Sequence, residues 1–241
     1  MDEQRNNMNI LSSSALKLLA CAFMLLDHIG VRLFPQVLAL RLLGRLAFPL
    51  FAFFIGEGCR YTSNRLRHFL SVFLLGVLCE SVYIIYMGGW YGNILLTFSL
   101  SILLIYLMQW CRLQSGSLPY LLMAAALAAC YALSCYVNFD YGFFGIILPL
   151  FAAYPGDRLV ENTDIIPKPL KKEHKLLLFG IGIMLTSINS AMGWNQLYAL
   201  LTLPLLAMYS GKPGKRTLKY FFYIFYPVHL LLIEATAMLI R

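Results

Sequence analysis

Apolar runs follow one another along the whole chain, and most of them are long enough to cross a membrane. There are nine, at residues 15–34, 44–61, 67–87, 93–111, 118–137, 141–155, 174–189, 194–210 and 219–240. A helix needs about 20 apolar residues to cross a hydrocarbon core about 30 Å thick, and only helices or closed barrels satisfy the backbone there. The pattern predicts an all-α, polytopic transmembrane helical bundle of about nine spans, with eight to ten possible.

The composition supports a single integral-membrane domain over residues 1–241. Hydrophobic residues make up 60% of the sequence and charged residues 12%, whereas globular domains contain about 45–50% apolar and about 25% charged residues. The apolar excess extends along the whole chain, without an internal repeat or a linker long enough to separate domains. The six cysteines form no CxxC pair or other metal-ligand spacing, so we expect no metal ion.

The basic residues lie in short loops between the apolar runs. The net charge of +8 therefore indicates contact with the anionic head groups of a lipid bilayer and not with nucleic acid. If the N-terminus is cytoplasmic, 15 of the 19 Lys and Arg residues lie on the cytoplasmic side, and the exceptions are Arg32, Arg41, Arg45 and Arg241. Because cytoplasmic loops are enriched in Lys and Arg, we expect a cytoplasmic N-terminus and a sixth run that crosses rather than re-enters.

Within six positions of the first apolar run lie three ionisable residues, Asp27, His28 and Arg32. An ionisable side chain at membrane depth costs at least about 2.5 kcal/mol, and a spanning helix has no wet face for it. His28 and Arg32 are four residues apart and project from the same side of a helix. We interpret this stretch as the centre of a reaction site inside the membrane. The alternative for Arg32, and for Arg41 and Arg45 nearby, is that they snorkel at helix ends.

Polar residues of other runs fall at a similar depth. At about 1.5 Å per residue, Glu80, Asn93 and Asp140 fall in the outer half of the membrane or at its outer face, and His229 falls near mid-depth. Buried titratable groups that converge from different helices indicate a water-accessible cavity. Depth does not define the rotation of a helix, so the convergence of these side chains on His28 is a hypothesis.

Five segments together resemble one family, in the order in which that family has them. They are ALKL (residues 15–18), LDHIG (26–30), GRLAFPLF (44–51), DYG (140–142) and FYPVH (225–229). On these segments the chain resembles the TraX family, named for the F-pilin N-terminal acetylase of conjugative plasmids, over nearly its whole length. That family is similar to a wider group of membrane acyltransferases that take acetyl from coenzyme A. The group includes sugar O-acetyltransferases and the lysosomal heparan glucosaminide acetyltransferase.

The resemblance implies acetyl transfer by an acyltransferase-like domain in the bacterial inner membrane. His28 is the counterpart of the early-helix histidine that is regarded as catalytic in the wider group, and it would act as a general base or be acetylated itself. Acetyl-CoA would enter from the cytoplasm and bind through its phosphates to basic loops, at Lys171, Lys172, Lys212, Lys215 and Arg216. The acceptor would approach from outside, and a pilin N-terminus, a glycan and a small metabolite remain possible.

The other expected site residues support this reaction. Asp27 or Glu80 would orient the His28 ring, and His229 is a further candidate for the catalytic group. The residues expected to contact the substrate or the oxyanion are Arg32, Arg45, Asn93 and Asp140. Either of the two arginines would stabilise the oxyanion of a tetrahedral intermediate.

Two other classes of function are compatible with the same residues. Buried Asp, Glu and His in a small helical bundle also suit a proton-coupled small-molecule transporter, although no repeat relates the two halves of this chain. The second alternative is a non-catalytic assembly factor of the cell envelope. Radiolabelled acetyl-CoA offered to the protein in membranes discriminates between them, because an enzyme yields acetylated product and a transporter gives flux alone.

Overall fold

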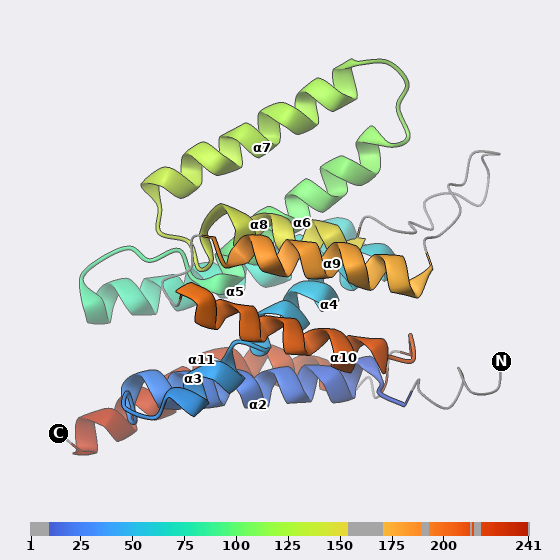
Figure 1. The fold of residues 1–241 in the computed structure, drawn as a ribbon. Coiled ribbons are helices and arrows are strands. Elements are labelled where there is room, and N and C mark those ends of the chain that lie inside the picture. The colour runs from blue at the N-terminus through green and yellow to red at the C-terminus, as the bar shows by residue number, and fades with distance from the viewer. Residues whose placement is uncertain (1–9, 154–170, 189–192, 213, 215–217, 241) are drawn as a thin grey trace. The chain divides into compact units, whose positions relative to one another are not determined.

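The computed structural model describes residues 10–153, 171–188, 193–212, 214 and 218–240, and these residues form helices and connecting turns (Figure 1). The bridge between Leu11 and Tyr209 is the one pairing of extended backbone within these ranges. The predicted all-α class is therefore confirmed. The chain divides into two compact units: unit 1 consists of Met1–Phe51 and Ala191–Arg241, and unit 2 consists of Ala52–Ser190.

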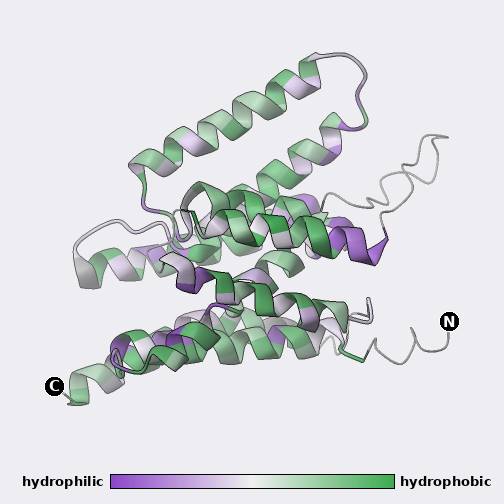
Figure 2. Cartoon of the chain, viewed as in Figure 1, coloured by the Kyte–Doolittle hydropathy of each residue, from purple (hydrophilic) through white to green (hydrophobic). Residues whose placement is uncertain are grey.

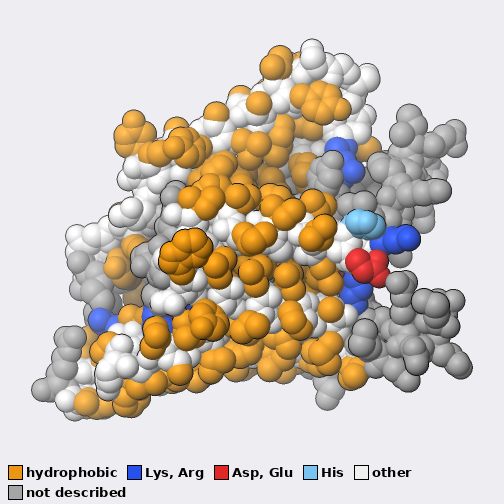
Figure 3. All heavy atoms as spheres, in the orientation of Figure 1, with side chains coloured by type: hydrophobic (Ala, Val, Ile, Leu, Met, Phe, Trp, Pro, Cys, Tyr) orange, Lys and Arg blue, Asp and Glu red, His pale blue; other side chains and the backbone are white. Residues whose placement is uncertain are grey.

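Six helical segments are long and apolar enough to cross a membrane, counted over the described part of the chain. They are Ser13–Arg32 (α2), Leu38–Tyr61 (α3, Leu38–Gly44, with α4, Ala47–Tyr61), Arg65–Ile85 within α5 (Arg65–Met87), Ile94–Cys111 (α6), Leu118–Tyr136 (α7) and Phe221–Ile240 within α11 (Lys219–Ile240). Apolar residues dominate these helices (Figure 2), and hydrophobic side chains cover much of the face shown in Figure 3. The protein is a multi-helical membrane protein.

The other three predicted apolar runs form shorter helices. They are α8 (Gly142–Ala153), α9 (Lys172–Thr186) and a 3-10 helix, η1 (Gly193–Leu201), that continues as α10 (Thr202–Ala207). A 3-10 helix rises about 2.0 Å per residue, so the nine residues of η1 and the six of α10 together extend over about 27 Å. The number of about nine crossings stays a prediction.

In unit 1, α2 packs against both α3 and α11. The side chain of Ser12 caps α2 by accepting a hydrogen bond from Ala15 N at 3.3 Å, which satisfies a backbone donor that the first turn leaves open. Gly44 lets α3 approach α2 closely, since a Cβ at this position would lie 2.4 Å from Asp27 Cβ. This close approach places the end of α3 beside Asp27.

The segment formed by η1 and α10 runs along α2 in the opposite direction. Its first part, η1, contacts α3. The residues that follow α10 reach the start of α2, where Leu11 N donates to Met208 O at 3.0 Å and Ser13 N donates to Lys212 O at 2.9 Å. Unit 1 is thus assembled from the two ends of the sequence.

In unit 2, α6 packs against α5, α7 and α8, and α8 also packs against α9. A hydroxyl group links two of these helices, because Ser101 Oγ donates to Ile146 O at 2.6 Å. The C-terminal half of α4 meets α8 at Gly56, where an added Cβ would lie 2.7 Å from Pro149 O. Small residues and hydroxyl groups at helix contacts are typical of membrane proteins.

Replacing Gly56 by Ala is predicted to lower the Tm of the detergent-solubilised protein by about 2–10 °C. Overpacking costs about 1–3 kcal/mol, and 1 kcal/mol shifts the Tm by about 2–4 °C at this chain length. Gly58→Ala on the same helix is the matched control, since its Cβ would lie 3.4 Å from His68 Cε1 in ordinary contact. Equal Tm values for the two variants would contradict the described contact between α4 and α8.

Candidate active site

Two histidines contact each other in unit 1, one from α2 and one from α11. His28 Nδ1 lies 2.8 Å from His229 Nε2, although 201 residues separate them in the sequence. His229 is buried, with 3% of its surface exposed. The structure therefore brings together two of the residues that the sequence placed in the catalytic group.

The hydrogen bonds of this pair determine where its protons lie when both rings are neutral. His229 Nδ1 is 2.7 Å from the backbone oxygen of Phe225. A carbonyl oxygen only accepts hydrogen bonds, so His229 Nδ1 donates and His229 Nε2 is left as an acceptor. His28 Nδ1 must then donate to His229 Nε2, and the lone pair of His28 lies on its Nε2. An oriented imidazole with a lone pair can take a proton or attack a carbonyl carbon.

Asp27, the neighbour of His28 in the sequence, binds two arginines of unit 1. Arg45 Nη2 donates to both carboxylate oxygens at 2.7 and 2.8 Å, and Arg41 Nη1 lies 2.8 Å from Asp27 Oδ1. Arg45 Nη1 also donates to Gln196 Oε1 at 3.4 Å. One carboxylate and two guanidinium groups give this arginine cluster a net charge of +1 beside His28.

Arg32 forms a two-pronged ion pair with Glu234, one turn beyond the histidine pair. Arg32 Nε and Nη2 each lie 2.5 Å from a carboxylate oxygen, and about one third of each side chain is exposed (33% and 35%). Because His28 pairs with His229 and Arg32 pairs with Glu234, α2 and α11 run in the same direction. Arg32 and Arg45 both bind carboxylates, and an oxyanion role for either stays a prediction.

The side chain that contacts the His28 ring differs from the one that the sequence led us to expect. We expected Asp27 or Glu80 to orient this ring, and the structure places His229 against it. The carboxylate of Asp27 binds Arg41 and Arg45 instead, because charge-assisted two-pronged pairs with arginine are stronger than a bond to a neutral imidazole.

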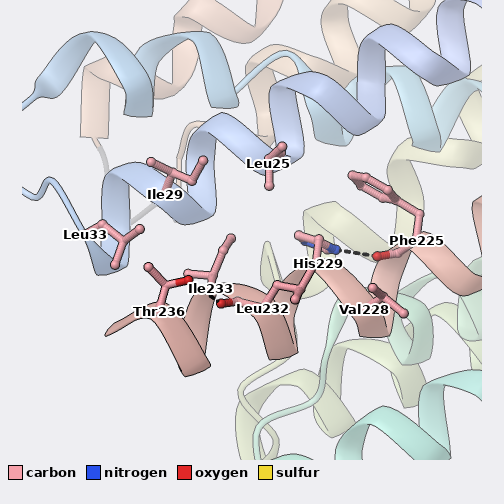
Figure 4. A pocket seen from close by; sticks show the side chains of 9 residues that line it. All are labelled: Leu25, Ile29, Leu33, Phe225, Val228, His229, Leu232, Ile233 and Thr236. Carbon is pink, nitrogen blue, oxygen red and sulfur yellow. Dashed lines mark hydrogen bonds between the residues drawn. The ribbon is translucent and has the colours of Figure 1, made fainter. Parts of the chain in front are cut away.

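An open apolar groove lies between α2 and α11 and includes His229 in its lining (Figure 4). Its volume is about 300 Å³, which is at the lower end for ligand pockets. The residues that line it are Leu25, Ile29, Leu33, Phe225, Val228, His229, Leu232, Ile233 and Thr236. The groove thus joins the histidine pair to the apolar surface of unit 1.

Glu80, Asn93 and Asp140 lie together in unit 2, around the turn between α5 and α6. Glu80 is almost fully buried and accepts hydrogen bonds from Asn93 Nδ2 at 2.9 Å and from Tyr91 N at 2.6 Å. Tyr91 donates its hydroxyl to Asp140 Oδ1 at 2.5 Å. Burial and the nearby Asp140 carboxylate raise the pKa of Tyr91. These contacts close the turn, and a role of the three residues in substrate binding stays a prediction.

The residues expected to bind the phosphates of acetyl-CoA lie in both units. Lys171 and Lys172 lie at the start of α9, Lys212 follows α10, and all three are exposed. Ammonium groups on the surface have the chemistry that phosphate groups require. Lys215 and Arg216 lie outside the described residues. Among the described residues, no group of three His, Cys, Asp or Glu is arranged to hold a metal ion.

Sequence reasoning missed two polar residues that are part of buried clusters. Gln196 is fully buried against Arg45, and its position inside an apolar run was a signal that it faces protein. In unit 2, Lys175 Nζ donates to Glu57 Oε1, which also accepts from Arg60 Nη1 at 2.8 Å. Lys175 and Glu57 are far apart in the sequence, so the spacing of residues does not predict their contact.

The fold and the paired histidines define an all-helical membrane protein with a candidate reaction site between its first and last long helices. The chain belongs to the TraX family: the family model described as TraX protein matches residues 12–236. The predicted resemblance is thus confirmed.

Two relatives of known sequence match the chain. The probable fimbrial assembly protein FimC, serogroup H1, of Dichelobacter nodosus is 25% identical, and the match covers 95% of this chain and 97% of that protein. An uncharacterised protein of Rickettsia prowazekii (strain Madrid E) is 26% identical, and the match covers 63% of this chain and 71% of that protein. No solved structure matches the chain.

Replacing Asp27 by Asn is predicted to lower the free energy of unfolding by about 3–5 kcal/mol, because it leaves two largely buried arginines without their carboxylate. Glu234→Gln is the matched control, since it leaves a single arginine without its carboxylate and about one third of this pair is exposed, so a smaller loss is expected. Unfolding by SDS in mixed micelles measures both values. A smaller loss for Asp27→Asn than for Glu234→Gln would contradict the described cluster.

Proposed function

We propose that the protein is an acetyl-CoA-dependent acetyltransferase of the bacterial inner membrane, with His28 as its reactive residue. The observation that carries the proposal is the hydrogen-bond chain from the Phe225 carbonyl through His229 to His28. These two hydrogen bonds leave the lone pair of His28 on Nε2. In hydrolases, a buried acceptor orients the catalytic histidine in the same way. A transporter site needs no such defined tautomer.

His28 Nε2 would take the proton of an acceptor hydroxyl or amine as that group attacks the acetyl carbonyl. Acetyl-CoA supplies the acetyl group as a thioester, whose carbon–sulfur bond breaks as the new ester or amide bond forms. The proton on His28 Nε2 then goes to the sulfur of the leaving thiolate, so that the imidazole returns to its starting state. Acetylation of His28 Nε2 itself, followed by transfer, is the second route that the same lone pair permits.

His229 would keep the His28 ring in position through both proton transfers. Its Nε2 accepts from His28 Nδ1, and its own Nδ1 is held by the backbone of α11. The positive charge that forms on the His28 ring is then shared along the pair. The arginine cluster of Asp27, Arg41 and Arg45, with a net charge of +1, favours negative charge nearby and would stabilise an oxyanion.

The exposed Lys171, Lys172 and Lys212 support a donor that enters from the cytoplasm, as do Lys215 and Arg216 in the sequence. The acceptor would come from outside or from within the membrane. The Dichelobacter nodosus relative is named as a probable fimbrial assembly protein. We therefore propose that this chain acts in the assembly of pili or fimbriae, with a pilin N-terminus or a glycan as the acceptor. The same name also favours the second candidate, a non-catalytic assembly factor.

The directions of packed helices support an odd number of crossings, in agreement with the nine crossings that we propose; the cytoplasmic N-terminus rests on the distribution of Lys and Arg in the sequence. Because successive crossings alternate in direction, two parallel helices such as α2 and α11 are the first and last of an odd number of crossings. A total of six crossings would make α2 and α11 antiparallel. In unit 2, α6 and α8 are parallel, as the contacts of Thr97 with Asp140 and of Ser101 with Ile146 indicate. The antiparallel run of η1 and α10 along α2 also agrees with alternate crossings.

His28→Ala is predicted to lower kcat for acetyl transfer by at least about 10²–10⁴, the usual contribution of general acid–base catalysis, and His229→Gln to lower it by less, because His229 only positions the His28 ring. Transfer of radiolabelled acetyl from acetyl-CoA to membrane and periplasmic acceptors measures both. His174→Ala is the matched control, because His174 is exposed near the start of α9. Full activity of purified His28→Ala would contradict the proposed role of His28.

The nine-crossing topology is tested on the two loops that flank α7. On a Cys135→Ser background, Asn138→Cys is predicted to react with a membrane-impermeant maleimide in intact cells, because both residue 138 and the C-terminal end of α7 lie outside in this topology. Gln114→Cys, exposed at the other end of α7, is predicted to react only after lysis. Labelling of Gln114→Cys in intact cells would contradict the orientation.

A further inference from the structure

We propose that the groove between α2 and α11 holds the hydrocarbon chain of a medium-chain acyl-CoA, so that the enzyme transfers acyl groups of up to about eight carbons as well as acetyl. This inference rests on the proposed function, since it names the acyl groups that the histidine pair acts on. It begins from the position of His229, which is both the partner of His28 and part of the lining of the groove.

The dimensions of the groove fit one extended chain. Phe225 and Thr236 line its two ends and lie eleven residues apart on α11, which corresponds to about 16 Å. A volume of about 300 Å³ over this length leaves a mean cross-section of about 19 Å², whereas a helix about 10–12 Å across needs several times as much. The groove therefore has the width of one hydrocarbon chain, and a transmembrane helix of a partner protein could place only side chains in it.

The position of the histidine along the groove sets the length of the chain. His229 and Thr236 are seven residues apart on α11, or about 10 Å. An extended chain advances about 3.6 Å for every three bonds, so about eight bonds fit between the histidine and the far end. An acyl group bound with its thioester at His28 would thus extend along Leu232 and Leu33 toward Thr236.

The lining has the chemistry of a hydrocarbon site. Apart from His229 and Thr236, its residues are aliphatic or aromatic. Figure 4 shows Leu25 and Ile29 of α2, and Leu33 at its C-terminal end, across the groove from the side chains of α11. Arg32 and Glu234 neutralise each other near its outer end, so no unpaired charge among these neighbours opposes an apolar chain. Each methylene that enters is stabilised by about the same hydrophobic increment.

The test compares kcat/KM for acetyl-, butyryl-, hexanoyl- and octanoyl-CoA with protein in bilayer nanodiscs. We expect the octanoyl value to be at least equal to the acetyl value, with gains of up to about fourfold per added methylene before the groove is full. Values that fall steeply from butyryl onward, while acetyl is transferred, would overturn this inference and leave the proposed function intact. Absence of transfer from every donor would overturn the proposed function.

Substitutions at two neighbouring residues of α11 test whether the preference for octanoyl-CoA arises from the groove. Leu232 lines the groove and is 63% exposed, whereas Leu231 is 52% exposed and does not line it. Leu232→Trp fills the groove and is expected to lower the octanoyl-to-acetyl ratio of kcat/KM at least tenfold, and Leu232→Ala to keep or raise it. Leu231→Trp should leave the ratio unchanged. An unchanged ratio in Leu232→Trp would show that bilayer lipid occupies the groove, and would overturn the inference.

A photoreactive octanoyl-CoA with a diazirine at the end of its chain gives a readout that does not depend on turnover. We expect mass spectrometry to find the label on peptides of α2 and α11, and Leu232→Trp to abolish it. Labelling of these peptides without any transfer would support the groove while contradicting the enzyme. Labelling confined to other helices would overturn the proposed chain site.

Discussion

The structure of unit 1 depends on one constraint, that a charge in hydrocarbon must find a partner of opposite charge or a hydrogen bond. Asp27 satisfies it with Arg41 and Arg45, and Arg32 satisfies it with Glu234. The first set joins the consecutive helices α2 and α3, and the second joins α2 to α11, more than 200 residues further along the chain. The membrane offers these charges no water as an alternative partner. The same requirement that makes these residues costly therefore makes them the contacts that assemble α2, α3 and α11.

The pairing of Asp27 with arginines determines which side chain binds the ring of His28. Since Asp27 binds the arginines, the ring of His28 bonds to His229, whose other nitrogen is held by the Phe225 carbonyl. A neutral chain of donors and acceptors thus ends at His28 Nε2, next to a cluster with a net charge of +1. In the proposed reaction, basic and cationic functions are separated in this way: the imidazole would take and return protons, and the arginine cluster is suited to negative charge.

Much of the fold could be predicted from the sequence, because apolar runs determine helices in a membrane almost by themselves. The runs at residues 15–34 and 219–240 correspond to α2 and α11. Counting residues at about 1.5 Å each also placed His28 and His229 at a similar depth, and the structure brings these two side chains into contact. Which helices face each other was not readable. The rotation of each helix depends on packing features such as the close approach of Gly44 to Asp27. The spacing of apolar residues in the sequence does not predict such contacts.

Several residues of the expected site do not lie beside His28. Their grouping depends on the rotation of the helices and on contacts between residues that are distant in the sequence. Glu80, Asn93 and Asp140 share a depth with His28 in the sequence, yet they bond to one another and to Tyr91 within unit 2. Gln196 joins Arg45 from a run that is otherwise largely apolar. Depth thus predicted which residues are buried and polar, and only the three-dimensional contacts divided them into clusters.

The protonation of His28 tests the account most directly, because every proposed step uses the lone pair on its Nε2. Nitrogen-15 NMR of histidine-labelled protein in nanodiscs measures it, with His28→Gln to identify the signals of this ring. We predict that near neutral pH Nδ1 of His28 carries the proton and Nε2 does not, and that His229→Ala removes this preference. A proton on Nε2 of neutral His28 in the unaltered protein would contradict the account.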